Sequence, residues 1–226
     1  ERDRQFREEV PQFREVDLGE RAIRVLARLR GMAPPPPDER WDQERAATRS
    51  TPAEIAWLID AYSAAFIEAI PPPARVRIAL ERLAEGHDLA ILSNWPLAAT
   101  IDRYVEAAGW SPFLRAIVVS QRVGTIKPQP AIFAAAREQL GGPPPRAILH
   151  VGDDWQADIL GAAGAGWRVA YVRGRPHDSP LPSSDRDGSV VPDFEIDDVA
   201  ELVGLLNTGA RNRRRPAGRR RGSPTT

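Results

Sequence analysis

Three groups of polar residues in this chain each follow a short apolar segment, and together they could act on an anionic substrate. Residues 93–94 are Ser-Asn, residues 127–128 are Lys-Pro, and residues 152–158 hold three carboxylates. A hydroxyl beside backbone N–H groups suits an anionic oxygen, an ammonium neutralises it, and carboxylates suit Mg²⁺. In this order they indicate chemistry on a phosphoryl group. Taken alone, Ser93-Asn94 is more simply explained as a helix N-cap.

Lys127 is the only lysine among the 31 basic residues of the chain. In a sequence so biased toward arginine, a retained lysine indicates a position where a compact ammonium fits and a planar guanidinium does not. We therefore predict that Lys127 neutralises a phosphoryl oxygen and a carboxylate. The alternative is a surface lysine without a function.

The acidic segment begins directly after an apolar run that ends at Val151. Asp153 and Asp158 could point into one crevice, and carboxylates gathered at one strand end repel each other unless a cation is bound. We predict that both bind Mg²⁺, and that Asp154 caps the helix that follows. The glycines later in that helix are expected to permit close packing on the sheet: Gly161, Gly164 and Gly166.

The residues around these groups alternate between short apolar strands and helices. Strands are expected at residues 87–93, 115–120, 146–152 and 167–172. Helices are expected at residues 74–85, 96–108, 129–140, 155–165 and 197–206, with a polar, proline-rich loop at 174–192. This alternation predicts a doubly wound parallel sheet in residues 73–206. Ligands bind at the carboxyl ends of such strands, which is where all three polar groups fall.

Residues 1–72 are expected to form a separate helical unit. Residues 17–30 place apolar side chains at helical spacing, and proline runs follow at 34–37 and 71–73. Thr51-Pro52-Ala53-Glu54 has an N-cap residue, a proline at the first helical position and the acidic partner of a capping box. Residues 207–226 lack apolar periodicity and are expected to be a disordered, arginine-rich tail.

The composition excludes several classes of protein. The chain has no cysteine, so it holds neither disulfides nor thiolate metal sites, and this suits the cytoplasm. No apolar run is long enough to cross a membrane. Seven of the 31 basic residues lie in the last sixteen positions. Residues 1–210 therefore hold 24 basic and 31 acidic residues. This balance argues against nucleic-acid binding by the body, and the tail is interpreted as a solvated extension. The oligomeric state is not defined.

The three polar groups together resemble motifs of the haloacid dehalogenase (HAD) superfamily. The Ser93-Asn94 pair resembles its second motif, and Lys127-Pro128-x-Pro130-x-Ile132-Phe133 its third. The segment Gly152-Asp153-x-x-x-x-Asp158, followed by Gly-Ala and Ala-Gly, resembles its fourth. The helical unit resembles the cap that part of the superfamily carries between the first and second motifs. The resemblance is close over residues 50–206 and loose over residues 1–50.

This resemblance implies a Rossmann-like core. It also implies a phosphomonoester phosphatase in which an Asp attacks phosphorus and an aspartyl-phosphate forms and is hydrolysed. Ser93 and the backbone at Asn94 would bind the phosphoryl group, and Lys127 would hold the nucleophile and the transferring phosphoryl. Asp153 would bind Mg²⁺, with Asp158 supporting the metal or Lys127. The expected substrate is a small phosphorylated metabolite.

The chain departs from the family at the first motif, an Asp-x-Asp-x-Thr or Ser segment after an apolar strand. Residues 1–30 contain only Asp3 and Asp17, and neither follows such a strand. In this fold the missing strand would lie between the strands at 88–93 and 146–151. We therefore expect a truncated N-terminus, a sheet without its central first strand and an inactive 226-residue chain, with the nucleophile upstream of residue 1.

Two alternatives remain. A 2-haloacid dehalogenase on the same scaffold needs no metal, and Asp153 and Asp158 argue against it. A non-catalytic HAD-like binding protein would be free to lose Lys127 and the acidic cluster, and the chain retains both. Among the remaining residues, we expect His150 to be a satisfied core histidine and Trp95 to line the site.

Overall fold

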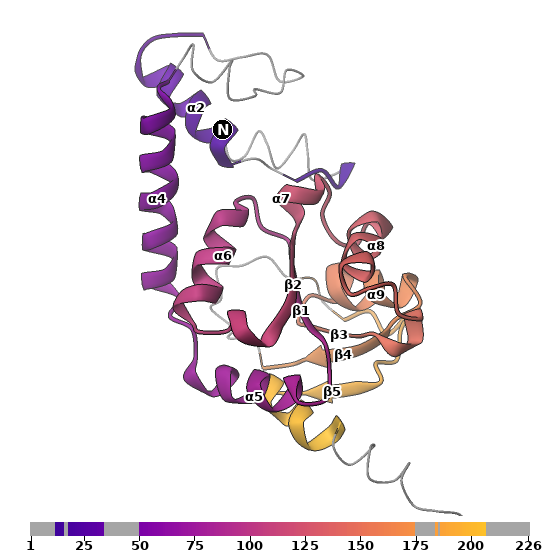
Figure 1. The fold of residues 1–226 in the computed structure, drawn as a ribbon. Coiled ribbons are helices and arrows are strands. Elements are labelled where there is room, and N and C mark those ends of the chain that lie inside the picture. The colour runs from indigo at the N-terminus through magenta and orange to yellow at the C-terminus, as the bar shows by residue number, and fades with distance from the viewer. Residues whose placement is uncertain (1–11, 16–17, 34–49, 175–183, 185, 207–226) are drawn as a thin grey trace, which may run out of the picture.

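The computed structural model describes residues 12–15, 18–33, 50–174, 184 and 186–206 (Figure 1). Strand β1 (Leu89–Ser93) pairs with β2 (Leu114–Val119), while β3 (Leu149–Gly152), β4 (Arg168–Val172) and β5 (Phe194–Ile196) pair in that order. Every pair of these strands is parallel. The predicted α/β class is therefore confirmed.

The strands fall into two sheets rather than one. Within the part of the chain that the structure describes, β1 and β3 are each paired on one side only. Their apolar side chains, such as Leu92 and Val151, are half-buried, although strands of a doubly wound sheet are ordinarily buried on both faces. The division falls where we expect a further strand, and the absence of that strand from the sheet stays a prediction.

Helices connect the strands in the expected alternation. They are α5 (Ala74–Ala84), α6 (Ala98–Ala107), α7 (Ser120–Val123), α8 (Pro130–Gln139), a π-helical segment η4 (Trp155–Leu160) and α9 (Gly161–Gly164). Short 3₁₀ turns lie at η2 (Ser111–Phe113), η3 (Pro145–Ala147) and η5 (Val199–Glu201). Strand β5 was not predicted, because its three residues are too few to show a periodicity. Pairing with β4 holds them in the extended conformation.

Two apolar clusters cover opposite faces of the β3-β4-β5 sheet. Val169 belongs to a cluster with Phe133 of α8 and Trp155 of η4, and its neighbour Ala170 belongs to another with Leu83 of α5. Successive residues of a strand point to opposite faces, so helices lie on both sides of the sheet. Figure 1 shows α8 and α9 on one side of the strands and α5 on another.

The helical unit consists of α2 (Leu18–Leu29) and α4 (Pro52–Ala69) in its described part. The capping box is confirmed: Thr51 Oγ1 accepts the Glu54 N–H at 3.3 Å, and Glu54 Oε2 accepts the Thr51 N–H at 2.9 Å. Helix α4 stands beside α6 (Figure 1) and is joined to it by a buried hydroxyl pair, Ser63 and Thr100, at 2.8 Å. The use of this unit as a cap stays a prediction.

Residues 12–15 lie along the core rather than in a helix of this unit. Arg14 forms an antiparallel bridge with Thr125, and Phe13 O accepts the backbone N–H of Ile126 at 2.9 Å. This segment therefore supports the loop that leads to Lys127. The arginine-rich tail at 207–226 lies outside the described residues. Among the residues that are described, no helix is long and apolar enough to cross a membrane.

Candidate active site

Asn94 and Lys127, predicted from separate motifs, are in direct contact. Asn94 lies in the turn after β1, and Lys127 lies in the loop between α7 and α8. Asn94 Oδ1 accepts the backbone N–H of Lys127 at 2.7 Å, and Asn94 Nδ2 donates to the Lys127 carbonyl at 3.2 Å. The Asn94 side chain therefore fixes the backbone that carries Lys127. The predicted contact with a phosphoryl group involves the backbone of Asn94 and not its side chain.

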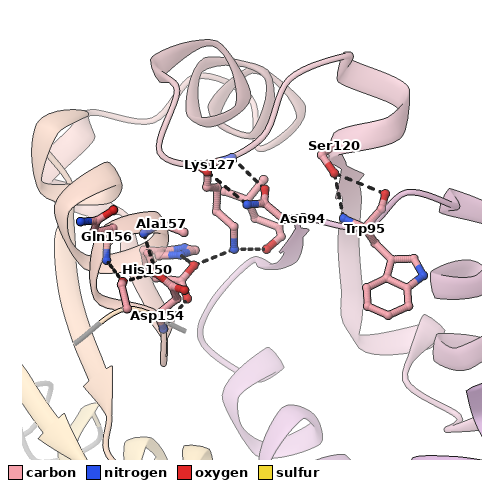
Figure 2. Close-up of polar contacts among 11 residues, drawn as sticks. Asn94, Trp95, Ser120, Lys127, His150, Asp154, Gln156 and Ala157 are labelled. Carbon is pink, nitrogen blue, oxygen red and sulfur yellow. Dashed lines mark hydrogen bonds and ion pairs between the residues drawn. The ribbon is translucent and has the colours of Figure 1, made fainter. Parts of the chain in front are cut away.

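The ammonium group of Lys127 links strand β1 to η4, the helical segment that follows β3. Its Nζ donates to the Leu92 carbonyl of β1 at 3.1 Å and to Asp158 Oδ1 at 2.6 Å. The side chains of Lys127 and Asp158 are only 10% and 7% exposed. Figure 2 shows this side chain reaching between the turn of Asn94 and His150. Lys127 is therefore a buried, paired charge at the carboxyl ends of the strands, which excludes a free surface lysine.

Both oxygens of the Asp158 carboxylate contact other groups of the protein. Its Oδ1 accepts Lys127 Nζ and lies 3.0 Å from His150 Nε2, and its Oδ2 accepts the Asp154 backbone N–H at 3.1 Å. Burial opposes its ionisation, but the Lys127 ammonium and the His150 ring hold the pKa of Asp158 below its ordinary value. This geometry favours Asp158 as the partner of Lys127 over Asp158 as a metal ligand.

His150 has a polar role that the sequence reasoning missed. It is buried, as expected, with edge-to-face contacts to Phe133 and Trp167 at centroid distances of 5.7 and 6.2 Å. Its Nε2 nevertheless contacts Asp158 Oδ1. The sequence signal was its position two residues before Gly152. Residues two apart in a strand share a face, and Asp158 occupies the space beside Gly152 on that face.

Asp153 and Asp154 differ in their surroundings. Asp154 caps η4, as predicted, with its Oδ1 accepting the Ala157 N–H at 2.8 Å. Asp153 follows β3 directly and is half-buried. Mg²⁺ takes oxygen ligands and keeps several waters, so one carboxylate supplies only part of a site. Asp158 is held by Lys127. Asp153 and Asp158 both stay predicted ligands, and no cluster of three metal-binding side chains occurs among the described residues.

Ser93 ends β1 and is half-buried, with no hydrogen bond from its hydroxyl to any residue that the structure describes. Ser120, which sequence reasoning did not single out, is fully buried and accepts the Trp95 backbone N–H at 2.8 Å. The Trp95 indole points away from Lys127 (Figure 2) and packs against Phe66, with 4.6 Å between the ring centroids. The expectation that Trp95 lines the site stays a prediction.

Comparison with known proteins agrees with this fold. A family model for haloacid dehalogenase-like hydrolases matches residues 4–166, and the chain belongs to that family. It is similar to the 2-haloacid dehalogenase of Pseudomonas syringae pv. Tomato, with a TM-score of 0.61 and 22% identity over 92% of this chain and 78% of that one. At this identity the likeness concerns the fold.

Two curated relatives are phosphatases. The chain is 37% identical to the glyceraldehyde 3-phosphate phosphatase of Methanopyrus kandleri over 100 residues, which cover 44% of this chain and 41% of that protein. It is 30% identical to the ribulose-1,5-bisphosphate 5-phosphatase of Halopiger xanaduensis over 159 residues, which cover 69% of this chain and 65% of that protein. The matches thus span between two fifths and two thirds of these relatives.

Proposed function

We propose that this chain forms the phosphate-binding and metal-binding part of a Mg²⁺-dependent phosphatase that acts on a small phosphorylated metabolite in the cytoplasm. The observation that carries the proposal is the position of Lys127. Its ammonium is fixed between Leu92 O and Asp158 Oδ1 at the carboxyl ends of the strands. A buried cation held in place before the substrate arrives stabilises negative charge that develops in a transition state.

The ammonium retains one donor for a ligand. A lysine has three N–H donors, and two of them are used by Leu92 and Asp158. The third has no acceptor among the residues that the structure describes. It would donate to a phosphoryl oxygen, and the positive charge of the ammonium would hold the attacking carboxylate nearby. Asp158 balances the charge of Lys127 in the absence of substrate and keeps its Nζ from turning away.

Ser93 and Asp153 would complete the contacts with the phosphoryl group. The Ser93 hydroxyl and the backbone of Asn94 would donate to its oxygens from the end of β1. Asp153 would hold Mg²⁺ as one of several oxygen ligands, and the ion when bound would neutralise charge on the phosphoryl group. The two phosphatases named above support phosphoryl transfer.

The nucleophile is proposed to be an Asp on a strand that precedes residue 1 and pairs between β1 and β3. The one-sided pairing of those strands supports this placement, as does the direction of Lys127 across them. The Asp carboxylate would attack phosphorus and break its bond to the ester oxygen, which would take a proton from water and leave as the alcohol. Water would then hydrolyse the aspartyl-phosphate to inorganic phosphate and restore the carboxylate. Without that strand the 226-residue chain is expected to be inactive.

A 2-haloacid dehalogenase is the second candidate, because the fold is shared with such an enzyme. That reaction proceeds without a metal ion, so it gives no account of Asp153 at the end of β3. Release of halide from 2-chloropropionate in the presence of EDTA would favour it. A non-catalytic binding protein would show neither activity.

The test uses the gene product translated in frame from the DNA upstream of Glu1, compared with residues 1–226 alone. Phosphate release is measured over a panel of phosphorylated metabolites, with MgCl₂ or with EDTA. We expect release by the longer chain with Mg²⁺ only, and none by residues 1–226. A longer chain that contains an Asp-x-Asp motif but releases no phosphate from any substrate would contradict the proposal.

A further inference from the structure

Ser184 lies against the turn that follows β3, although 28 residues separate it from Gln156. Its hydroxyl donates to Asp154 Oδ1 at 2.6 Å and accepts the backbone N–H of Gln156 at 2.6 Å. The same Asp154 oxygen accepts the N–H of Ala157 at 2.8 Å (Figure 2). The first N–H groups of η4, which have no partner within the helix, are thus satisfied jointly by Asp154 and Ser184.

Trp155 provides a second attachment for the same segment. Its indole Nε1 donates to Asp187 Oδ1 at 2.7 Å, and the Arg186 guanidinium lies over its ring at 5.2 Å from the centroid. The Trp155 side chain is fully buried and meets Tyr171 of β4 edge to face at 5.3 Å. A buried indole N–H needs an acceptor, so Asp187 fixes the ring as well as the start of η4.

The segment is itself held in place. Arg186 Nη1 pairs with Glu195 Oε1 of β5 at 2.9 Å. The N–H and hydroxyl of Ser189 donate to Asp187 Oδ1 at 2.9 and 2.6 Å. Residues 184 and 186–189 therefore connect β5 to the acidic turn, and Figure 1 shows β5 and β4 side by side.

From these contacts we infer that Ser184 and Asp187 are positioning residues for residues 153–156, which present the Asp153 carboxylate at the end of β3. The inference rests on the proposed Mg²⁺-dependent function, because it makes the affinity for Mg²⁺ depend on a segment that supplies no ligand. Partners behind a metal ligand set its orientation, and their loss weakens metal binding. Without the Ser184 hydroxyl, Gln156 N–H loses its acceptor and Asp154 loses a donor.

The experiment compares Ser184→Ala and Ser184→Thr with the parent protein in the longer gene product. Ser111→Ala, which changes an exposed serine of η2, is the matched control. Asp187→Asn tests the second attachment. Amide hydrogen exchange of residues 153–160 is followed by mass spectrometry without metal. The dissociation constant for Mg²⁺ is measured by isothermal titration calorimetry with MgCl₂ as the only ligand.

Ser184→Ala is expected to speed exchange of residues 153–160 about tenfold, as for the loss of one hydrogen bond. It is also expected to weaken Mg²⁺ binding roughly tenfold, as for the loss of a group that orients a metal ligand. Asp187→Asn should act in the same direction, whereas Ser184→Thr and Ser111→Ala should match the parent.

Unchanged exchange in Ser184→Ala overturns the inference. So does faster exchange with an unaltered dissociation constant for Mg²⁺, which would show a purely structural contact. These outcomes leave the proposed function standing. A parent protein that binds no Mg²⁺ contradicts the proposed function itself, so the two failures are distinguishable.

Discussion

Gly152 and Asp158 occupy positions that leave no room for a side chain at residue 152. A Cβ atom built on Gly152 would lie 2.3 Å from both Cγ and Oδ2 of Asp158. The Asp158 carboxylate, held by Lys127 and His150, fills the space beside the backbone of β3. The glycine is thus part of the arrangement that keeps Lys127 in place.

Gly152→Ala is expected to push Asp158 away from Lys127. The displaced carboxylate would leave a buried ammonium without its counter-ion, and removing one partner of a buried ion pair costs about 3–5 kcal/mol. We expect a large loss of phosphatase activity in the longer gene product and a lower free energy of unfolding. Kinetic assays and urea titration measure the two effects. A variant with parental activity would contradict the packing described here.

Gly161 and Gly164 form a matched pair in α9. A Cβ at Gly161 would lie 2.7 Å from Cζ of Phe133 and 3.1 Å from the Cα of Pro128, whereas one at Gly164 would meet nothing within 4 Å. Gly161→Ala should lower the free energy of unfolding by about 1–3 kcal/mol through overpacking. Gly164→Ala should be neutral or stabilise by up to about 1 kcal/mol, through helix propensity. Urea unfolding should show a loss of stability for Gly161→Ala and none for Gly164→Ala, and equal effects would refute the close-packing role.

His150→Phe is expected to keep the aromatic packing and remove the contact with Asp158. We expect kcat in the longer gene product to fall by roughly tenfold, the effect of one hydrogen bond to a charged group. KM should change little, because His150 does not reach the substrate. His87→Phe, at an exposed position before β1, is the control. If both variants behaved alike, His150 would be a packing residue only.

Asp193 should make the stability of the protein depend on pH. It accepts the Val169 N–H at 3.0 Å and Arg168 Nε at 2.9 Å. Burial opposes its ionisation, but these donors hold the pKa of Asp193 below its ordinary value. A lowered pKa in the folded state gives stability that is present above the unfolded pKa, about 4, and is lost as the pH falls through the folded pKa.

Asp193→Asn is therefore expected to lower the free energy of unfolding by about 1–2 kcal/mol at pH 7 and by less at pH 3. Urea unfolding at the two pH values measures the difference. Glu106→Gln, at an exposed position of α6, should change neither value. An equal loss for Asp193→Asn at both pH values would show that its charge is unimportant.

The sequence was sufficient to predict strands β1 to β4, the longer helices between them and the edge of the sheet where polar residues gather. Apolar runs such as Leu89–Leu92 and Leu149–Val151 are strands because of local composition, and the Thr51 capping box is a purely local signal. Lys127 and Asp158 were both predicted, since parallel strands bring their carboxyl ends together. Whether Asp158 binds metal or Lys127 depended on a distance, which no pattern supplies.

Contacts between distant segments were beyond the sequence. The link of Ser184 to Asp154 joins residues 30 apart across a proline-rich loop, and neither residue type is unusual in a loop. The direction of Trp95 depended on Phe66 in α4, an element of the helical unit. Strand β5 exists because β4 offers it an unpaired edge, so its three residues gave no signal of their own.

The most direct test of the account is the turnover of Lys127→Arg and Lys127→Ala in the longer gene product. The Lys127 side chain is 10% exposed and its ammonium is fixed by two acceptors, so a guanidinium would keep the charge but not the geometry. We predict that both variants lose roughly 10²–10³-fold in kcat, as when a group that stabilises transition-state charge is removed. Near-parental turnover by either variant would contradict the role assigned to Lys127.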